Sequence, residues 1–259
     1  MRSLMDQELI ENSTTRKLEP LTKKQYPSWL VFLDQLGRRI LDVLVSSVGL
    51  LIISPMFIVI GTIIKRDTPG PVFYHGPRVG KNGRIFKILK FRTMYEKPES
   101  YNGRRLTVNG DSRVTEAGRW LRESKFNELP QLWNVFLGQM SLVGPRPEDP
   151  QIYENWPEDY KVQYIKVRPG MTSPASLMFF DEENRISTTN AEKDYLKNIL
   201  PFKLGIDFSY LEHRTIINDL DTLFMTFISL FPKMRENRIK ETTLDKGPFI
   251  SFFYGFFNW

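Results

Sequence analysis

One apolar run dominates the pattern of hydrophobic and polar positions along the chain. Residues 43–64 read VLVSSVGLLIISPMFIVIGTII and contain no charged residue. As a helix, this run would be about 33 Å long, which is enough to span a hydrocarbon core of about 30 Å. Ser54 and Pro55 lie near its centre, and a proline inside a helix removes a backbone donor and usually causes a kink. The run therefore predicts either one spanning helix or a helix-break-helix hairpin that returns to the same side.

Basic residues flank this run on both sides, with Arg38 and Arg39 before it and Lys65 and Arg66 after it. Because the two ends carry equal numbers of basic residues, the positive-inside rule does not predict which end faces the cytoplasm. A hairpin that dips into one leaflet would place both basic pairs among anionic headgroups, where each charge contributes about 1 kcal/mol. Because proline is also tolerated in spanning helices, the residues alone leave both topologies open.

Shorter patterns after the apolar run predict a mainly helical domain with a small β-structure. Residues 72–74 and 85–91 have β-prone or alternating sequences, which predict a β-hairpin. Helical patterns occupy residues 116–125, a segment that begins around Glu128, and residues 159–167, 190–200 and 215–231. The last of these has a broad apolar face, which suits packing on a core or lying on a membrane.

Composition and charge exclude some kinds of site without naming a function. The chain has 259 residues, which is long enough for one substantial catalytic unit. Its formal net charge of +6 favours anionic partners such as phosphates, acidic lipids or nucleic acid. It contains no cysteine and two histidines, His75 and His213, which excludes disulfides, thiolate metal sites and a histidine-rich metal centre. Any metal would therefore need oxygen ligands.

The two ends of the chain differ in character. Residues 1–24 are polar and lack the apolar core and cleavage site of a secretory signal, so we expect the N-terminus to stay in the cytoplasm. The C-terminal residues read GPFISFFYGFFNW, and such aromatic rings favour the headgroup level of a bilayer. This tail is either a second membrane-surface anchor or a cover for the protein's own core.

Arginine and glutamate residues supply the groups that phosphate chemistry needs. Guanidinium groups suit bidentate contact with phosphate oxygens, and arginines occur in turn-rich contexts at Arg92, Arg113, Arg119, Arg122, Arg146 and Arg168. Each alone is more often a solvated surface residue, but Arg146 lies between two prolines, where a stiff backbone favours binding. Glu128 is the leading carboxylate to bind Mg²⁺ or attack phosphorus, although a glutamate at a helix start more often only satisfies the helix dipole. The sequence contains no P-loop and no dinucleotide-binding fingerprint.

Five ordered segments resemble the motifs of bacterial sugar transferases. They read SPMFIVIGTIIKRDTPGPVFY, GRIFKILKFRTM, DSRVTEAGRWLR, NELPQLWNVFLGQMSLVGPRPE and RPGMTS, and the resemblance extends from about Arg38 to Phe231. Those proteins are monotopic polyprenyl-phosphate sugar-1-phosphate transferases, and the chain is similar to their short form, without an N-terminal four-helix membrane bundle. The resemblance implies a membrane hairpin hinged at Ser54 and Pro55.

The fold class implied is α+β and mainly helical, with a re-entrant helix-break-helix, amphipathic interfacial helices and a small β-hairpin around one catalytic domain. Along the chain this predicts a polar extension over residues 1–37, a membrane hairpin over 38–66, a cytoplasmic catalytic domain over 67–235 and an aromatic tail over 236–259. The expected location is the bacterial inner membrane, with the catalytic domain on its cytoplasmic face.

The resemblance also implies a reaction and its residues. In the family an Asp-Glu pair acts with Mg²⁺: the aspartate attacks the β-phosphate of a UDP-sugar, UMP leaves, and polyprenyl (undecaprenyl) phosphate then accepts the phosphosugar. Glu128 matches the family's Mg²⁺-binding glutamate. Arg122 and Arg146 match its phosphate-binding arginines, and Asp111 with Arg113 matches its Asp-x-Arg motif. The expected partners are these two substrates, the membrane and downstream glycosyltransferases, and a homo-oligomer is left open.

Two positions depart from the family pattern. Asn127 occupies the place of the nucleophilic aspartate, and Ser173 that of the more usual glycine after threonine. Because a neutral amide is a far poorer nucleophile, three routes stay open: attack by Glu128, direct attack by the lipid phosphate with Asn127 orienting it, or loss of catalysis. The last corresponds to a silent membrane-anchored scaffold or lipid-carrier-binding relative. Nucleic acid is not an expected partner, because the sequence has no recognisable reading helix or stacked-aromatic module.

Overall fold

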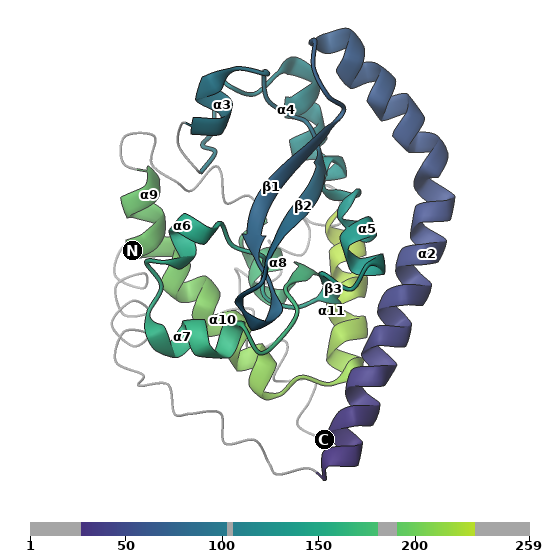
Figure 1. Ribbon diagram of the computed structural model, residues 1–259, viewed down its shortest axis with the longest axis vertical. Coiled ribbons are helices and arrows are strands. Elements are labelled where there is room, and N and C mark those ends of the chain that lie inside the picture. The colour runs from purple at the N-terminus through teal and green to yellow at the C-terminus, as the bar shows by residue number, and fades with distance from the viewer. Residues whose placement is uncertain (1–26, 103–105, 181–190, 231–259) are drawn as a thin grey trace, which may run out of the picture.

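The computed structural model describes residues 27–102, 106–180 and 191–230. One long helix, α2 (Ser28–Asp67), lies along one side of the molecule and curves beside the remaining elements (Figure 1). Those elements are a two-stranded hairpin and many short helices. The expected mainly helical α+β fold with a small β-hairpin is therefore confirmed at this level. The aromatic tail and most of the polar extension lie outside the described residues.

Helix α2 exposes much of its apolar surface. Leu51, Ile52 and Ile58 are 76%, 70% and 74% exposed, whereas Ile60 and Ile64 are buried. Among the described helices, α2 is the one whose length and hydropathy suffice to cross a membrane. Such a concentration of exposed aliphatic groups indicates a surface that lies in lipid or against another apolar surface.

The helix continues through Ser54 and Pro55, so the break expected there is not present. Pro55 has no N–H, so it cannot donate the helical hydrogen bond that the carbonyl of Leu51 would otherwise accept. The hydroxyl of Ser54 donates to that carbonyl at 2.9 Å and replaces the missing donor. Helix α2 also begins at Ser28, before the expected start at Arg38. Re-entry of this helix into one leaflet stays a prediction.

The expected hairpin is present and longer than predicted. Strand β1 (Phe73–Val79) pairs antiparallel with β2 (Ile85–Phe91). The turn between them places Asn82 and Gly83 at φ of 60° and 71°, a left-handed conformation that asparagine and glycine tolerate best. Strand β1 extends beyond Tyr74, the predicted end of this strand, to Val79, because its pairing with β2 continues to the turn.

The remaining elements are short. In chain order they are α3 (Pro98–Asn102), α4 (Glu116–Glu123), a 3-10 turn (Phe126–Glu128), α5 (Gln131–Phe136), β3 (Ser141–Val143), α6 (Pro150–Tyr153), α7 (Glu158–Tyr164), β4 (Gly170–Thr172), α8 (Pro174–Met178), α9 (Ala191–Asp194), a π-helical turn (Tyr195–Ile199), α10 (Leu200–Glu212) and α11 (Ile216–Ser229). Strands β3 and β4 pair in parallel. The predicted helices correspond to α4, α5, α7, α9 to α10, and α11.

Buried apolar side chains join these elements. One cluster connects α2 to β2 and α4 through Ile60, Ile64, Phe91 and Leu121. A second packs β2, α5 and β3 together, and Leu50 of α2 lies against it. A third fills the space among α6, α7 and α10. The long helix is therefore attached to the hairpin and to the helices around it at more than one level.

Polar side chains in the first half of α2 bind the domain directly. Asp42 accepts hydrogen bonds from the main-chain N–H of Leu142 at 2.8 Å and from the hydroxyl of Ser141 at 3.0 Å. Arg39 donates to the carbonyls of Val135 and Phe136, both at 2.7 Å. These bonds fix α2 against α5 and against β3, the strand that leads into the candidate site.

Candidate active site

Glu128 lies where three segments of the chain meet. It ends the 3-10 turn after α4, and Lys90 reaches it from β2 while Arg146 reaches it from the turn after β3. Lys90 Nζ donates to Oε1 at 3.0 Å, and Arg146 Nη1 donates to Oε2 at 3.1 Å. The other terminal nitrogen of Arg146 also donates to Oε1. One carboxylate is thus shared by an ammonium and a forked guanidinium.

Neighbouring charges set the protonation states in this cluster. Burial alone would raise the pKa of Glu128, but the positive charges of Arg146 and Lys90 outweigh it and hold this pKa well below its ordinary value. Burial lowers the pKa of Lys90 to about 8, although the charge of Glu128 opposes that change. At neutral pH Glu128 is ionised and Lys90 carries its proton. Both side chains keep some contact with solvent, at 16% and 17% exposed.

Close contact between two glycines fixes the turn that carries Arg146. The N–H of Gly144 donates to the carbonyl of Thr172 at 3.0 Å, and the N–H of Gly170 donates to the carbonyl of Pro145 at 2.8 Å. A Cβ at Gly170 would lie 2.1 Å from the nitrogen of Gly144, so the two backbones could not approach this closely with a side chain between them. The turn is therefore anchored on β4 just before Arg146.

Asn127 precedes Glu128 but has different surroundings. Its side chain is 7% exposed, and its Oδ1 has no hydrogen-bond partner among the residues that the structure describes. A buried amide oxygen without a donor is rare and lowers stability. Asn127 therefore has a buried oxygen without a donor on the residue that precedes Glu128 in the chain, but it has no carboxylate of its own.

A match to a known family covers all of these positions. The family model described as bacterial sugar transferase matches residues 33–233. The chain belongs to this family. The resemblance drawn from the five motifs is confirmed.

The relatives include both short and long proteins. The chain is 33% identical over 217 residues to the undecaprenyl-phosphate glucose phosphotransferase of Komagataeibacter xylinus, a match that covers 81% of this chain and 38% of the relative. It is 35% identical over 208 residues to the exopolysaccharide production protein ExoY of Rhizobium meliloti (strain 1021), covering 74% and 84%. It is 37% identical over 192 residues to the UDP-N-acetylgalactosamine-undecaprenyl-phosphate N-acetylgalactosaminephosphotransferase of Aeromonas hydrophila, covering 73% and 42%. The chain therefore spans less than half of two of these relatives.

The structure places the other expected site residues in α4 and in the loop that precedes it. Arg122, in the last turn of α4, donates to the hydroxyl of Thr93 at 3.2 Å. Arg113 binds Asp111 with two prongs, Nε to Oδ1 at 3.0 Å and Nη2 to Oδ2 at 2.7 Å. Arg113 also donates to the carbonyl of Leu106 at 3.1 Å, so the pair stabilises its own loop. Phosphate contacts by these three residues stay a prediction.

Lys90 is the site residue that the sequence did not single out. It stands in the family motif GRIFKILKFRTM, whose alternation predicted a strand. Phe86 and Ile88 are buried and Lys87 is exposed, so the period of two along β2 puts Lys90 on the inward face. A lysine on the buried face of a strand is the signal that could have identified it.

The residues present suit a magnesium ion that takes only one or two ligands from the protein and the others from substrate or water. Among residues 27–102, 106–180 and 191–230, no group of three or more His, Cys, Asp or Glu side chains is arranged to hold a metal ion. Mg²⁺ commonly takes only one or two protein oxygens beside substrate phosphates. The carboxylate of Glu128 fits that smaller requirement, and the buried Oδ1 of Asn127 is a further oxygen on the preceding residue.

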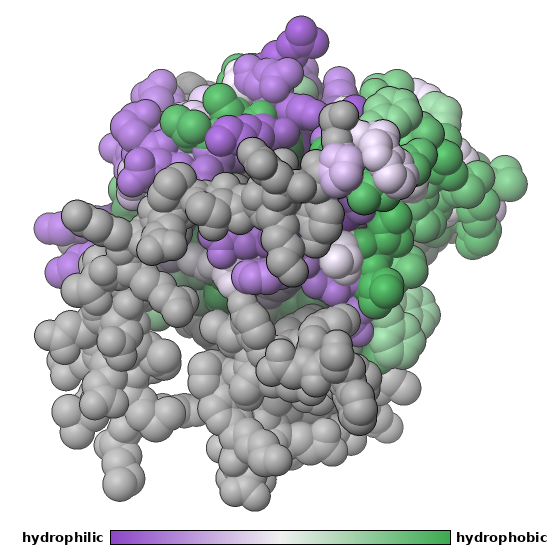
Figure 2. Space-filling model, turned by 90° about the horizontal axis from the view of Figure 1, so that it is seen from below, coloured by the Kyte–Doolittle hydropathy of each residue, from purple (hydrophilic) through white to green (hydrophobic). Residues whose placement is uncertain are grey.

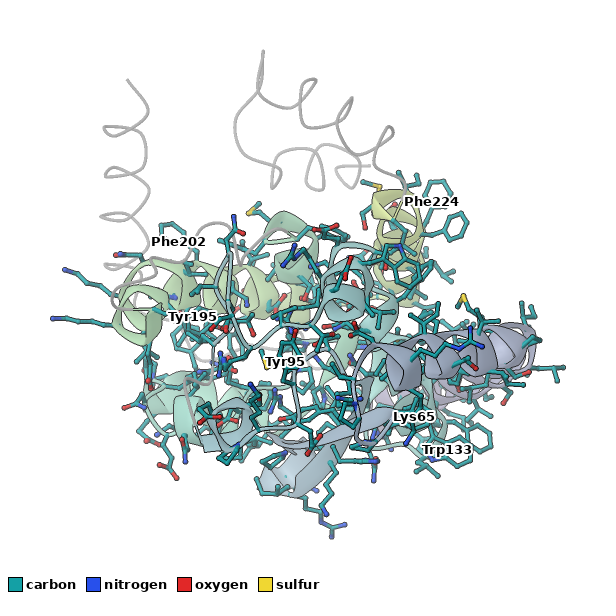
Figure 3. The ribbon with its side chains drawn as sticks, turned by 90° about the horizontal axis from the view of Figure 1, so that it is seen from above. Lys65, Tyr95, Trp133, Tyr195, Phe202 and Phe224 are labelled. Atoms are coloured by element: carbon teal, nitrogen blue, oxygen red, sulfur yellow. The ribbon has the colours of Figure 1, made fainter. Side chains whose placement is uncertain are left out.

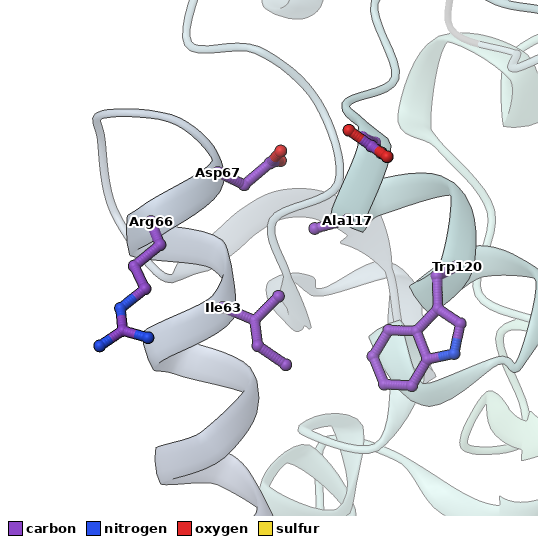
Figure 4. Close-up of a pocket in the computed structure, with 6 residues that line it drawn as sticks. Ile63, Arg66, Asp67, Ala117 and Trp120 are labelled. Carbon is purple, nitrogen blue, oxygen red and sulfur yellow. The ribbon is translucent and has the colours of Figure 1, made fainter.

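An open groove of about 530 Å³ lies between the end of α2 and α4 (Figure 4). Its lining residues are Ile63, Arg66, Asp67, Glu116, Ala117 and Trp120. Neither Glu128 nor Arg146 is among them, so this groove is separate from the charged cluster. It belongs to the side of the molecule on which α2 exposes its apolar surface.

Proposed function

We propose that this sugar transferase moves a sugar 1-phosphate from a UDP-sugar to undecaprenyl phosphate and releases UMP. This would be the initiating step of a bacterial exopolysaccharide, capsule, O-antigen or glycoprotein glycan. The observation that carries the proposal is the Glu128 carboxylate held by Lys90 and Arg146 within the family-matched region. The substrate class is supported by two relatives whose names describe sugar phosphotransferases acting on undecaprenyl phosphate.

The fixed charges suit a diphosphate that loses one of its phosphates. Arg146 and Lys90 would donate to the diphosphate oxygens and offset the negative charge that develops as the bond from the β-phosphorus to the UMP oxygen breaks. UMP leaves with the electron pair of that bond. An oxygen of Glu128 or of the lipid phosphate forms the new bond to phosphorus, because the buried amide of Asn127 is a poor nucleophile.

The two routes differ in their intermediate. Attack by Glu128 leaves a phosphosugar on the protein. An oxygen of the lipid phosphate then attacks its phosphorus, and the Glu128 carboxylate leaves with the electron pair of the bond that breaks. Attack by the lipid phosphate forms the product in one step. Rapid quenching with a radiolabelled UDP-sugar, in the absence of lipid acceptor, separates them, since protein-bound label is expected only for the first route.

We also propose Mg²⁺ as the cofactor, held by Glu128 with Asn127 beside it. The ion would supply positive charge to the diphosphate when bound. Chelation with EDTA should stop UMP release, and added Mg²⁺ should restore it.

The attachment of α2 supports a location on one face of a membrane, and we propose that this is the cytoplasmic face of the bacterial inner membrane. Arg39 and Asp42 near the start of α2 bind the domain, and Ile60 and Ile64 nearer its end are buried against Phe91. A helix that crossed the bilayer upright would carry one of these attachments, and polar parts of the domain with it, into the hydrocarbon. We therefore propose that α2 enters and remains at one face, as the re-entrant topology requires.

The apolar surface of the molecule supports the same placement. Figure 2 shows hydrophobic side chains concentrated on the side where α2 lies. Phe224 of α11 and Trp133 of α5 point outward on either side of α2 (Figure 3) and are 60% and 47% exposed. Aromatic rings in such positions favour the headgroup level of a membrane, so we propose that α5 and α11 rest at that level.

Turnover by the purified protein tests the proposed function. The full chain in nanodiscs, with Mg²⁺ and undecaprenyl phosphate, would be given a panel of UDP-sugars, and UMP and lipid-linked sugar phosphate would be measured. Wild type is expected to release UMP with at least one donor, and Glu128→Gln to lose about 100-fold or more of the rate, as when one charge-stabilising group is removed from an active site. Glu123→Gln neutralises an exposed glutamate of α4 and is the matched control. Absence of product with every donor would refute the proposal.

A second candidate is a catalytically silent, membrane-anchored scaffold that binds the lipid carrier and recruits downstream glycosyltransferases. The neutral, buried Asn127 in place of the nucleophilic aspartate favours it. A scaffold would bind vesicles that contain undecaprenyl phosphate more tightly than vesicles without it, yet release no UMP.

A further inference from the structure

A stripe of polar residues runs along one face of helix α2. Asp34, Arg38 and Asp42 follow one another at steps of four residues, so they lie on the same side of the helix. Arg38 and Asp42 are buried, at 8% and 3% exposed. Helix α2 packs here against β3 and α11 (Figure 1). This polar stripe therefore faces the strand that leads into the candidate site.

A buried carboxylate of α11 receives hydrogen bonds from three other segments. Asp219 is 3% exposed, and Arg38 of α2 and the hydroxyl of Tyr210 of α10 both donate to it. Arg214, between α10 and α11, donates to its Oδ1 from Nε at 3.3 Å and to its Oδ2 from Nη2 at 3.2 Å. Arg38 also donates to the two oxygens of Asp34, at 2.9 Å and 3.0 Å. Two arginines and two carboxylates thus form one cluster of balanced charge between α2 and α11.

Arg214 connects this charge cluster to the main chain of β3. Its Nη2 donates to the carbonyl oxygen of Val143 at 2.8 Å. Asp42 binds the other two residues of the strand, through the hydroxyl of Ser141 and the N–H of Leu142. All three residues of β3 are therefore bound to the polar stripe of α2, either directly or through the charge cluster.

Stability alone is a weak reason for this arrangement. Buried ions lose their hydration, and replacing them with apolar side chains of similar volume is often neutral or stabilising. A carbonyl at the end of a strand needs only one donor, which a water molecule or a neutral side chain can supply. Here the donor is a guanidinium held by a buried carboxylate, and it binds Val143, three residues before Arg146. A displacement of Val143 would be carried along the chain into the turn of Arg146.

We propose that Arg214 and Asp219 are positioning residues that fix the end of β3 relative to α2. With that end fixed, the following turn holds the guanidinium of Arg146 against Glu128. This inference rests on the proposed phosphosugar transfer, in which Arg146 binds the diphosphate. Arg214 acts on Arg146 through the main chain, and Asp219 acts through Arg214. The position of the membrane helix is thereby linked to the geometry of the active site.

Hydrogen exchange in the full chain in nanodiscs tests the positioning without any turnover. The amides of Gly144 and Gly170 form hydrogen bonds between the turn and β4, so their exchange reports whether the turn stays on that strand. Arg214→Met should speed the exchange of both amides by about 10-fold or more, because it removes the donor from Val143. Arg214→Lys keeps a cation and should stay closer to the wild-type rate. Arg84→Met makes the same change at an exposed arginine after the β1–β2 turn and should have no effect.

Unchanged exchange of both amides in a folded Arg214→Met protein would overturn the proposal. If that variant does not fold, Arg214→Gln takes its place, because it is shorter and neutral and cannot reproduce the forked contact with Asp219. Wild-type exchange in Arg214→Gln would overturn the proposal equally.

Asp219→Asn tests the link to α2. A neutral amide holds the two arginines less firmly than a carboxylate does, so the same two amides should exchange faster in this variant as well. Exchange that stays at the wild-type rate would refute the connection between α2 and β3 through Asp219.

A double-mutant cycle then shows whether Arg214 acts through Arg146. Arg214→Met should lower kcat/KM for the UDP-sugar by about 10-fold or more, because a displacement of about 1 Å at an active site can cost about 100-fold. Arg214→Lys should recover most of that loss. Combined with Arg146→Ala, Arg214→Met should cause no loss beyond that of Arg146→Ala alone. Losses that multiply would overturn the proposal. Wild type that turns over no donor would refute the transfer function instead, while the exchange experiment would still decide the positioning.

Discussion

Replacing Lys90 with methionine should make the protein more stable and less active at the same time. Methionine keeps an unbranched apolar stem but removes the ammonium that lies 3.0 Å from Glu128. Burial lowers the pKa of Lys90 from 10.5 to about 8, so folding disfavours its charged form. At about 1.4 kcal/mol for each unit of pKa, this corresponds to about 3 kcal/mol. Solvent contact reduces this figure, so we expect the free energy of unfolding at pH 7 to rise by about 1–2 kcal/mol.

The pH dependence of stability gives an independent measure of the same effect. Between about pH 8 and 10.5 the unfolded chain keeps the proton of Lys90 while the folded protein releases it. The unfolded state then binds more protons, so wild-type stability should rise with pH across this window. Lys90→Met should lack that rise. Thermal unfolding in detergent at pH 7 and pH 9.5 measures both quantities.

Activity should move in the opposite direction from stability. Removing a charged donor from the diphosphate should cost about 1.5–3 kcal/mol of transition-state binding, or about 10- to 100-fold in kcat/KM for the UDP-sugar. Lys87→Met, at an exposed position of the same strand, is the matched control and should leave both properties unchanged. If Lys90→Met unfolds at a lower temperature than wild type, the ion pair with Glu128 stabilises the folded protein by more than burial of the Lys90 ammonium destabilises it. If its kcat/KM is normal, Lys90 does not bind substrate.

Three further changes test separate parts of the structure. Asn127→Asp should produce protein-bound phosphosugar that mass spectrometry finds on residue 127, and a protein without any adduct there would contradict the assignment of this position. Asp42→Ala should lower the free energy of unfolding by about 2–3 kcal/mol, because two buried donors lose their acceptor. Asp42→Asn keeps an acceptor oxygen, so its loss of unfolding free energy should be less than half of that. Equal losses in the two variants would refute the role of this oxygen. Gly144→Ala would put a Cβ 2.8 Å from the carbonyl oxygen of Arg168, so the turn that carries Arg146 would have to move. UMP release should then fall by about 10-fold or more in a protein with normal circular dichroism. A normal rate would show that the turn accommodates the added Cβ without displacing Arg146.

The sequence by itself determined the local elements and the family. The uncharged run predicted the apolar part of α2, and period-two alternation predicted β2, because side-chain periodicity depends only on neighbouring positions. Glu128 and Arg146 were also named in advance, since the family motifs and the stiff turn between two prolines are visible in the order of the residues.

Tertiary structure decided which of these groups meet. Lys90 contacts Glu128 across 38 positions of sequence, and Asp42 contacts Leu142 across 100, and no local pattern contains either pairing. The continuity of α2 at Pro55 was equally hidden, because it depends on a hydroxyl that supplies a hydrogen bond in place of the missing N–H. Propensity and periodicity act over one or two turns of chain, whereas an active site forms where packing brings separate segments within about 3 Å of one another.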